Sequence, residues 1–159
     1  MSDQATLQLA TRADAAGIAA LSRDRIEQGL GWSWTAPRVL RSLRDPATNV
    51  VVARQAGRMR GFGIMKYHDD EAHLLLLAVQ AQAGRRGIGS ALVVWLERSA
   101  LIAGIGQVIV EARLANAAAR AFYARLGYRE IQTVPGYYQG VEACVRLAKD
   151  LWLAPVAPG

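Results

Sequence analysis

The sequence predicts an α/β (α+β) fold with a single mixed central β-sheet of about seven strands, flanked by about four helices. Apolar runs typical of strands alternate with helix-like segments in the order β-α-α-β-β-β-α-β-α-β-β. The length of 159 residues and the 52% hydrophobic composition suit one globular domain with a substantial core. A glycine-rich turn, Gly84–Ser90, joins an apolar strand directly to an apolar-periodic helix.

The N-terminal part of the chain is expected to contain one strand and two helices. Thr6–Ala10 alternates in polarity and predicts the first strand. Asp14 is placed to cap a helix over Ala15–Gln28, which a pair of glycines would end. Thr35 is placed to cap a second helix that runs to about Leu43.

The middle of the chain predicts three consecutive strands. Val50–Arg54 and Met59–His68 form a hairpin, because a short glycine-containing turn separates them. An acidic turn then leads into the strand Ala72–Val79. The helix that follows the glycine turn is expected to run to about Ala103.

The C-terminal part predicts a strand, a helix and a closing strand pair. Gln107–Ala112 is a short buried strand, and a helix over about Ala115–Leu126 follows it. Tyr128–Val134 and Val141–Lys149 are expected to pair around a turn at Pro135–Gly140. We expect a single domain over residues 1–153 and a loose tail over residues 154–159.

Composition excludes several classes of protein. The N-terminus lacks the features of a signal peptide and no apolar run could span a bilayer, so a cytoplasmic location without membrane association is expected. One cysteine, Cys144, excludes an internal disulfide framework and a cysteine metal cluster. The net charge of +6 suits an anionic ligand, whereas scattered arginines without an aromatic stripe argue against direct nucleic-acid binding.

The glycine turn is suited to a phosphate-bearing ligand, because free N–H groups open the helix and basic residues lie beside them. A P-loop would need a lysine that Gly87–Ser90 lacks. A dinucleotide fold would need a third glycine where the chain has Leu92, although Glu111 lies at a suitable distance for a ribose-binding acid. The third candidate is a coenzyme A pyrophosphate site.

Two motifs favour coenzyme A. Gly87 and Gly89 fit the pattern [Gln/Arg]-x-x-Gly-x-[Gly/Ala], in which Gly84 takes the first position. The segment Asn116–Tyr128 fits Asn-x-x-Ala-x-x-x-Tyr-x-x-x-Gly-[Phe/Tyr] without a mismatch. In both motifs the chain resembles the GCN5-related N-acetyltransferase (GNAT) superfamily, over roughly Val50 to Lys149. The resemblance implies the GNAT fold, a β-bulge at the acetyl-CoA seam, and acetyl-CoA as cosubstrate without a metal.

Within the superfamily the chain is similar to the ribosomal-protein alanine N-acetyltransferases. Val110–Arg113 before Asn116 looks like their Glu-Val-Arg-x-x-Asn segment, and Tyr137-Tyr138 followed by Glu142 resembles their ending. The implied reaction is direct acetyl transfer in a ternary complex to a protein N-terminal α-amine, with a ribosomal protein as the acceptor that the resemblance suggests. One alternative is a small-molecule amine as the acceptor (amino acid, polyamine or drug). The other is a catalytically silent module that binds CoA or a nucleotide. A monomer or homodimer is expected.

Three residues are candidates for the chemistry. In the resembling family the glutamate at the position of Glu111 is the general base; the alternative is a surface carboxylate paired with Arg113 or Arg125. His73 is the second candidate base, since a histidine suits a proton relay; the alternative is a solvent-exposed histidine at a strand edge. Tyr123 would protonate the departing CoA thiolate, because its phenol stays protonated at pH 7.

The remaining candidates would hold the two substrates. Acetyl-CoA is expected to bind to three groups of residues. The main chain of the β-bulge (Leu77, Ala78 and Val79) and two residues of the helix after Glu111 (Asn116 and Tyr123) are the first two. The third is the glycine turn, with its N–H groups and arginines: Arg85, Arg86, Gly87, Ile88, Gly89 and Ser90. Aromatic residues on the two loops that would wall the acceptor pocket are expected to bind the amine: Trp34, Tyr137 and Tyr138.

Overall fold

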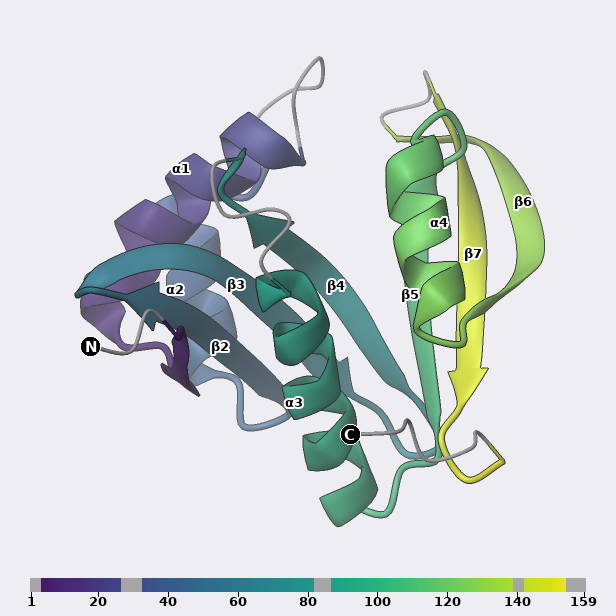
Figure 1. Ribbon diagram of the computed structural model, residues 1–159, viewed down its shortest axis with the longest axis horizontal. Helices are drawn as coiled ribbons and strands as arrows, with labels where there is room; N and C mark the ends of the chain where they lie inside the picture. Colours follow the sequence, from purple (N-terminus) through teal and green to yellow (C-terminus); the bar gives the residue numbers. More distant parts are fainter. Residues whose placement is uncertain (1–3, 27–32, 82–86, 139–141, 154–159) are drawn as a thin grey trace.

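The computed structural model describes residues 4–26, 33–81, 87–138 and 142–153, and contains one seven-stranded sheet in the order β1-β2-β3-β4-β5-β7-β6 (Figure 1). The strands are β1 (Thr6–Leu9), β2 (Thr48–Gln55), β3 (Arg58–Tyr67), β4 (Ala72–Val79), β5 (Gln107–Arg113), β6 (Arg129–Tyr138) and β7 (Glu142–Asp150). The helices are the 3-10 turn η1 (Arg12–Asp14), α1 (Ala15–Arg25), α2 (Ala36–Arg44), α3 (Ile88–Ile102) and α4 (Ala117–Arg125). The predicted mixed sheet and its order of elements are confirmed.

The parallel pair β4 and β5 forms the seam of the sheet. Its register covers only Ala72 opposite Val108, His73 opposite Ile109 and Leu74 opposite Val110. Strand β3 stays paired with β4 as far as Val79. Beyond Leu74 the two parallel strands therefore separate toward their C-terminal ends, as Figure 1 shows.

A bulge in β4 lies where this separation begins. Ile64 of β3 faces Leu76, and the next residue Met65 faces Leu74, so Leu75 is the extra residue. The prediction placed the bulge at Leu77–Val79, and this was wrong by about two residues. Four successive leucines give no sign of where the alternation of faces changes, because every one of them suits a buried strand.

The bulge divides β4 between the two cores of the molecule. Leu74 packs in a cluster with Leu92 and Leu96 of α3, whereas Leu76 packs in a second cluster with Ile18 of α1 and Val39 of α2. Helices α1 and α2 thus cover one face of the sheet, and α3 and α4 cover the other. The seam of β4 and β5 lies between these two layers.

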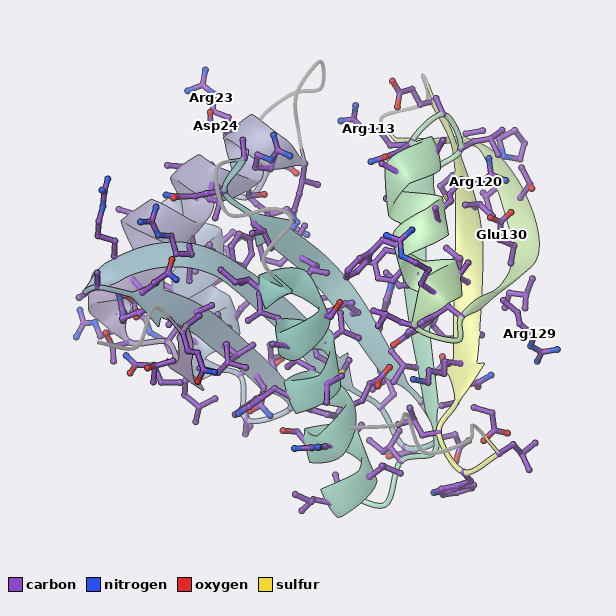
Figure 2. The ribbon with its side chains drawn as sticks, in the orientation of Figure 1. Arg23, Asp24, Arg113, Arg120, Arg129 and Glu130 are labelled. Carbon is purple, nitrogen blue, oxygen red and sulfur yellow. The ribbon has the colours of Figure 1, made fainter. Side chains whose placement is uncertain are left out.

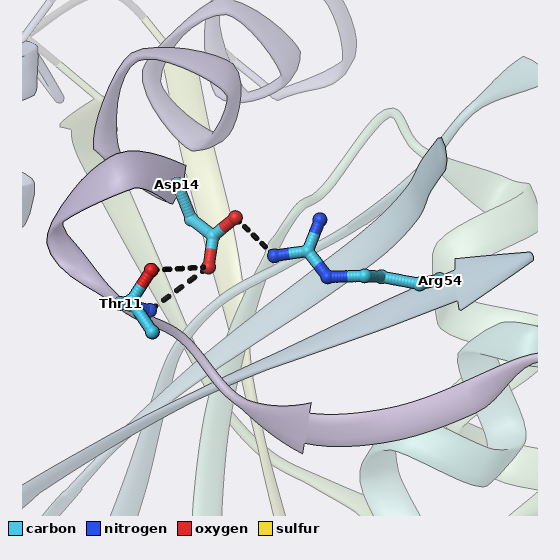
Figure 3. Close-up of polar contacts among 3 residues, drawn as sticks. All are labelled: Thr11, Asp14 and Arg54. Atoms are coloured by element: carbon cyan, nitrogen blue, oxygen red, sulfur yellow. Dashed lines mark hydrogen bonds and ion pairs between the residues drawn. The ribbon is translucent and has the colours of Figure 1, made fainter. Parts of the chain in front are cut away.

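The start of α1 differs from the prediction. Asp14 occupies the N-cap position, but its side chain does not cap α1. Its carboxylate instead accepts a hydrogen bond from the Thr11 backbone N–H at 2.8 Å and pairs with Arg54 of β2 (Figure 3). The expected end of the helix at Gln28 lies outside the described residues. Thr35 precedes α2 as predicted, without a capping bond from its side chain.

Strand β6 is longer than predicted. The expected turn began at Pro135, whereas β6 continues to Tyr138. Val134 faces Cys144 and Tyr138 faces Glu142, so extra residues of β6 bulge out of the register between these pairs. Proline is tolerated there because a bulge removes the need for its missing N–H donor.

No helix in the described ranges is long and apolar enough to cross a membrane.

Candidate active site

A cavity of about 640 Å³ lies where β4 and β5 separate. Its walls include Leu74–Leu77 of β4, Val110–Arg113 of β5, and the side chains of Asn116 and Tyr123 from α4. Trp34, which is buried, closes it from the side of α1 and α2. The cavity therefore draws its walls from both layers of helices and passes through the seam of the sheet.

His73 and Glu111 meet across this seam. The His73 Nε2 atom lies 2.7 Å from Glu111 Oε1, and both residues line the cavity. His73 faces Ile109 in the parallel register, so Glu111, two residues along β5, points to the same face of the sheet. Sequence separation hid this contact, since the two positions are 38 residues apart in the chain.

Glu111 is the more deeply placed of the two residues. Its side chain is 7% exposed, against 27% for His73. The other carboxylate oxygen, Oε2, lies 3.4 Å from Nε of Arg146, the residue opposite Glu111 on β7. The alternative that Glu111 is a surface carboxylate is therefore wrong. The carboxylate is held between a histidine on one side and a guanidinium on the other.

Tyr123 lines the same cavity from α4. Its side chain is 6% exposed and packs edge-to-face against Phe122 and Tyr128, with ring centroids 5.1 and 5.5 Å away. Behind it, the Tyr128 hydroxyl donates a hydrogen bond to buried Glu97 at 2.8 Å. Burial raises the pKa of Tyr128 well above its ordinary value, and the negative charge of Glu97 adds to this. Tyr123 is thus both a packed aromatic residue and part of the cavity wall.

Asn116 begins α4 and also faces the cavity. Its Oδ1 atom accepts a hydrogen bond from the Ala119 backbone N–H at 3.0 Å, which caps the helix. This bond uses the oxygen of the side chain and leaves the amide NH₂ group as a possible donor to a ligand. The capping role and a binding role are compatible.

The glycine turn opens α3 as predicted. Gly87 is the N-cap residue with φ of +75°, a left-handed conformation that favours glycine. A Cβ atom on Gly89 would lie 3.3 Å from the Phe122 ring, so the start of α3 packs closely against α4. Arg85 and Arg86 lie outside the described residues. Helix α3 begins at Ile88, so the backbone N–H groups of Ile88, Gly89 and Ser90 are the first ones of the helix. The first turn contains no acidic side chain.

Two other predicted binding regions have a mixed outcome. The Leu77 side chain lines the cavity, whereas Ala78 is buried in the core on the side of α1 and α2 and Val79 packs against the core on the side of α3. The edge of β4 that faces β5 is open to a ligand beyond Leu74, because no described residue of β5 pairs with it there, while the opposite edge stays paired with β3. The side chains of Tyr137 and Tyr138 lie outside the described part of the chain.

Arg113 lines the cavity although it was not among the predicted site residues. Its Nη2 atom donates to the Ile26 carbonyl at the end of α1 (2.7 Å), and its Nε lies 3.4 Å from a carboxylate oxygen of Glu142 at the start of β7. Figure 2 shows Arg113 beside the first turn of α4, on the side that faces α1. The available signal was its spacing, because Arg113 follows Glu111 by two residues and shares its face of β5.

Comparison with known proteins places the chain in a class and then in a family. Residues 46–130 match an acetyltransferase domain, described as Acetyltransferase (GNAT) domain. The chain belongs to the GNAT acetyltransferase family. The predictions of this fold, of this family and of acetyl-CoA as its cosubstrate are thereby confirmed at the level of the family.

Two relatives and one solved structure illustrate the similarity. An uncharacterized N-acetyltransferase of Methanocaldococcus jannaschii is 34% identical over 99 residues, which cover 62% of this chain and 64% of the relative. The [Ribosomal protein bS18]-alanine N-acetyltransferase of Escherichia coli is 37% identical over 84 residues, or 53% of this chain and 57% of that protein. The matched segments thus span less than two thirds of these curated relatives. The crystal structure of the ribosomal-protein-S18-alanine N-acetyltransferase from Escherichia coli superposes with a TM-score of 0.80 at 25% identity, over 98% of this chain and 99% of that one.

Proposed function

We propose that the protein transfers an acetyl group from acetyl-CoA to a primary amine by direct attack within a ternary complex, and that the acceptor is a protein N-terminal α-amine. The observation that carries this proposal is the His73–Glu111 pair, which faces the same cavity as Tyr123. The 37% identity to an enzyme named for ribosomal-protein alanine acetylation supports an N-terminal acceptor, with a ribosomal protein as the first candidate.

The residues around the seam fit coenzyme A. The N–H groups at the start of α3 and the neighbouring arginines would hold the pyrophosphate, and Gly87 allows the chain to turn there. The β4 edge beyond Leu74 and the Asn116 amide would bind the amides of the pantetheine arm. When bound, acetyl-CoA supplies an activated acetyl thioester.

An α-amine suits a site with a modest base. Only the neutral amine is a nucleophile, and an α-amine with a pKa near 8 costs roughly 1.4 kcal/mol to deprotonate at pH 7. A lysine side chain with a pKa near 10.4 costs roughly 4.6 kcal/mol. One histidine that accepts a proton, directly or through a water molecule, is therefore sufficient for an N-terminal acceptor.

His73 and Glu111 act together as that base. The ionised Glu111 carboxylate accepts the N–H of His73 Nε2, which leaves the His73 Nδ1 lone pair to take the proton of the amine. Glu111 then stabilises the imidazolium that forms, while Arg146 holds the carboxylate in place from the opposite side. We assign proton uptake to His73 and the supporting role to Glu111, because His73 is the more exposed of the two side chains.

Tyr123 completes the proton balance. As the new C–N bond forms and the C–S bond breaks, the Tyr123 hydroxyl gives its proton to the CoA sulfur. The His73 imidazolium then releases to solvent the proton it took from the amine, and the Tyr123 phenolate regains one from solvent, so the products are the N-acetylated acceptor and free CoA. A thiolate already leaves readily, so this step contributes less than the base.

Thiol release from acetyl-CoA, measured across N-terminal peptides and free amines, tests the proposal. We expect turnover with peptides that begin with a small residue. Turnover on free small amines but on no peptide would contradict the N-terminal acceptor. Binding of CoA without thiol release from any amine would contradict catalysis and indicate a silent binding module.

A further inference from the structure

The cavity wall carries positive charge on the side of α1 and α2. Arg25 at the end of α1 and Arg38 of α2 both line the cavity that contains His73 and Glu111. We infer that the acceptor carries a carboxylate close to its reacting amine, and that Arg25 and Arg38 bind that carboxylate. This inference rests on the proposed acetyl transfer and specifies its substrate class.

Two other guanidinium groups near the site, those of Arg113 and Arg146, already have carboxylate partners. Arg113 lies 3.4 Å from Glu142, and Arg146 lies 3.4 Å from Glu111. These pairs neutralise Glu111 and Glu142, the acidic side chains among the described residues that line the cavity. Within that described part of the wall, no acidic group is left to balance a further arginine.

Arg25 and Arg38 form no ion pair with a carboxylate of any residue in the ranges that the structure describes. The guanidinium of Arg38 lies 4.0 Å from the centroid of the Trp34 ring. Trp34 is itself 9% exposed, so this stacking holds the charge at a fixed position on the cavity wall. A guanidinium held on an aromatic face keeps its N–H edge free to bind a carboxylate in two places.

The two ends of such an acceptor match the two sides of the cavity. Its amine would meet the His73–Glu111 pair, and its carboxylate would meet Arg38 and Arg25. The net charge of +6 would also favour the approach of an acidic acceptor. The carboxylate can be the side chain of an acidic residue next to a peptide N-terminus, or the α-carboxylate of a free amino acid.

A matched series of acceptors tests the inference. C-terminally amidated peptides that begin Ala-Glu, Ala-Gln or Ala-Lys differ only in the charge beside the terminal residue. Free alanine and alaninamide provide the second source of the carboxylate. We expect kcat/KM for thiol release to be about tenfold or more higher for the acidic member of at least one series, and this preference to shrink as salt is raised.

Charge-removing variants assign the preference to residues. Arg38→Gln combined with Arg25→Gln should abolish the preference, whereas Arg38→Lys should keep part of it. Arg41→Gln is the matched control, because Arg41 is exposed on the same helix and does not contribute to the cavity wall. It removes the same charge and should leave the preference unchanged.

Binding measured without turnover separates this inference from the proposed function. The same peptides are titrated into the protein saturated with CoA, and their Kd values are compared. Tighter binding of the acidic peptide or of free alanine, lost in the double variant, supports the inference even if no amine is acetylated. Equal Kd and equal kcat/KM for acidic and neutral acceptors, or a preference that the double variant retains, would overturn it.

Discussion

His73 Nε2 lies 2.7 Å from Glu111 Oε1, across the seam where β4 and β5 stop pairing. The contact joins the strand that leads into the glycine turn to the strand that precedes α4. Both coenzyme-binding elements of the proposed site thus extend from the two strands that this pair connects. The separation of the two strands opens the cavity and also exposes the His73 side chain to that cavity.

Loss of either member of the pair should reduce catalysis. His73→Gln and Glu111→Gln are each expected to lower kcat/KM by about 10²-fold or more, because the first removes the base and the second removes the carboxylate that stabilises its protonated form. The remaining rate of Glu111→Gln should depend more steeply on pH. His68→Gln is the control, since His68 is exposed and is the other histidine of the chain. Kinetics of Glu111→Gln like those of the wild type would remove Glu111 from the mechanism.

Tyr123→Phe should affect the chemical step more than coenzyme binding. The variant keeps the ring packing against Phe122 and Tyr128 and removes only the hydroxyl. We expect kcat to fall about tenfold or more with KM for acetyl-CoA nearly unchanged, since the thiolate leaves less readily without a proton donor. Tyr67→Phe provides a control on β3, outside the cavity wall. An equal rise in KM with kcat intact would show a binding role instead.

Gly87→Ala should weaken coenzyme binding through the backbone. The residue has φ of +75°, and a side chain there costs about 1 kcal/mol or more of strain. Gly57 has the same φ and equally open surroundings in the turn between β2 and β3. Gly57→Ala should therefore lose similar stability in thermal unfolding while KM for acetyl-CoA stays constant. If both variants have the same KM, the turn before α3 does not bind the coenzyme.

The Asp14–Arg54 pair should make folding stability depend on acid pH. Burial raises the pKa of Asp14, but hydrogen bonds from Thr11 and Arg54 and the charge of Arg54 outweigh it, so the pKa falls below its ordinary 3.8. A lowered carboxyl pKa stabilises the folded state above about pH 4, and this contribution disappears as the pH falls through the folded-state pKa. Asp14→Asn and Arg54→Gln should both flatten the acid limb of stability measured by urea unfolding. An unchanged slope in both variants would contradict the assignment.

Local signals predicted most of the fold. The glycine turn, the Asn116–Tyr128 motif and the hairpin of β2 and β3 each contain their information within a few residues. The bulge at Leu75 could not be placed, because the run of leucines that contains it reveals no change of face. The side chain of Asp14 was misassigned because its partner Arg54 lies on another strand.

The candidate site was predictable as a set of residues and not as a geometry. His73, Glu111, Tyr123 and Asn116 each carried a signal of their own and now line one cavity. The contact between the first two depends on the parallel register, which no local pattern specifies. The arginines of the cavity wall were missed because the chain carries many of them, and only the tertiary structure distinguishes those with a carboxylate partner.

The most direct measurement of the central claim uses one peptide that contains both an N-terminal alanine and an internal lysine. After incubation with acetyl-CoA and the protein, mass spectrometry locates the acetyl group. The proposed mechanism predicts acetylation of the α-amine alone, and its loss in the variant that combines His73→Gln with Glu111→Gln. Acetylation of the lysine side chain, or undiminished acetylation by the double variant, would contradict it.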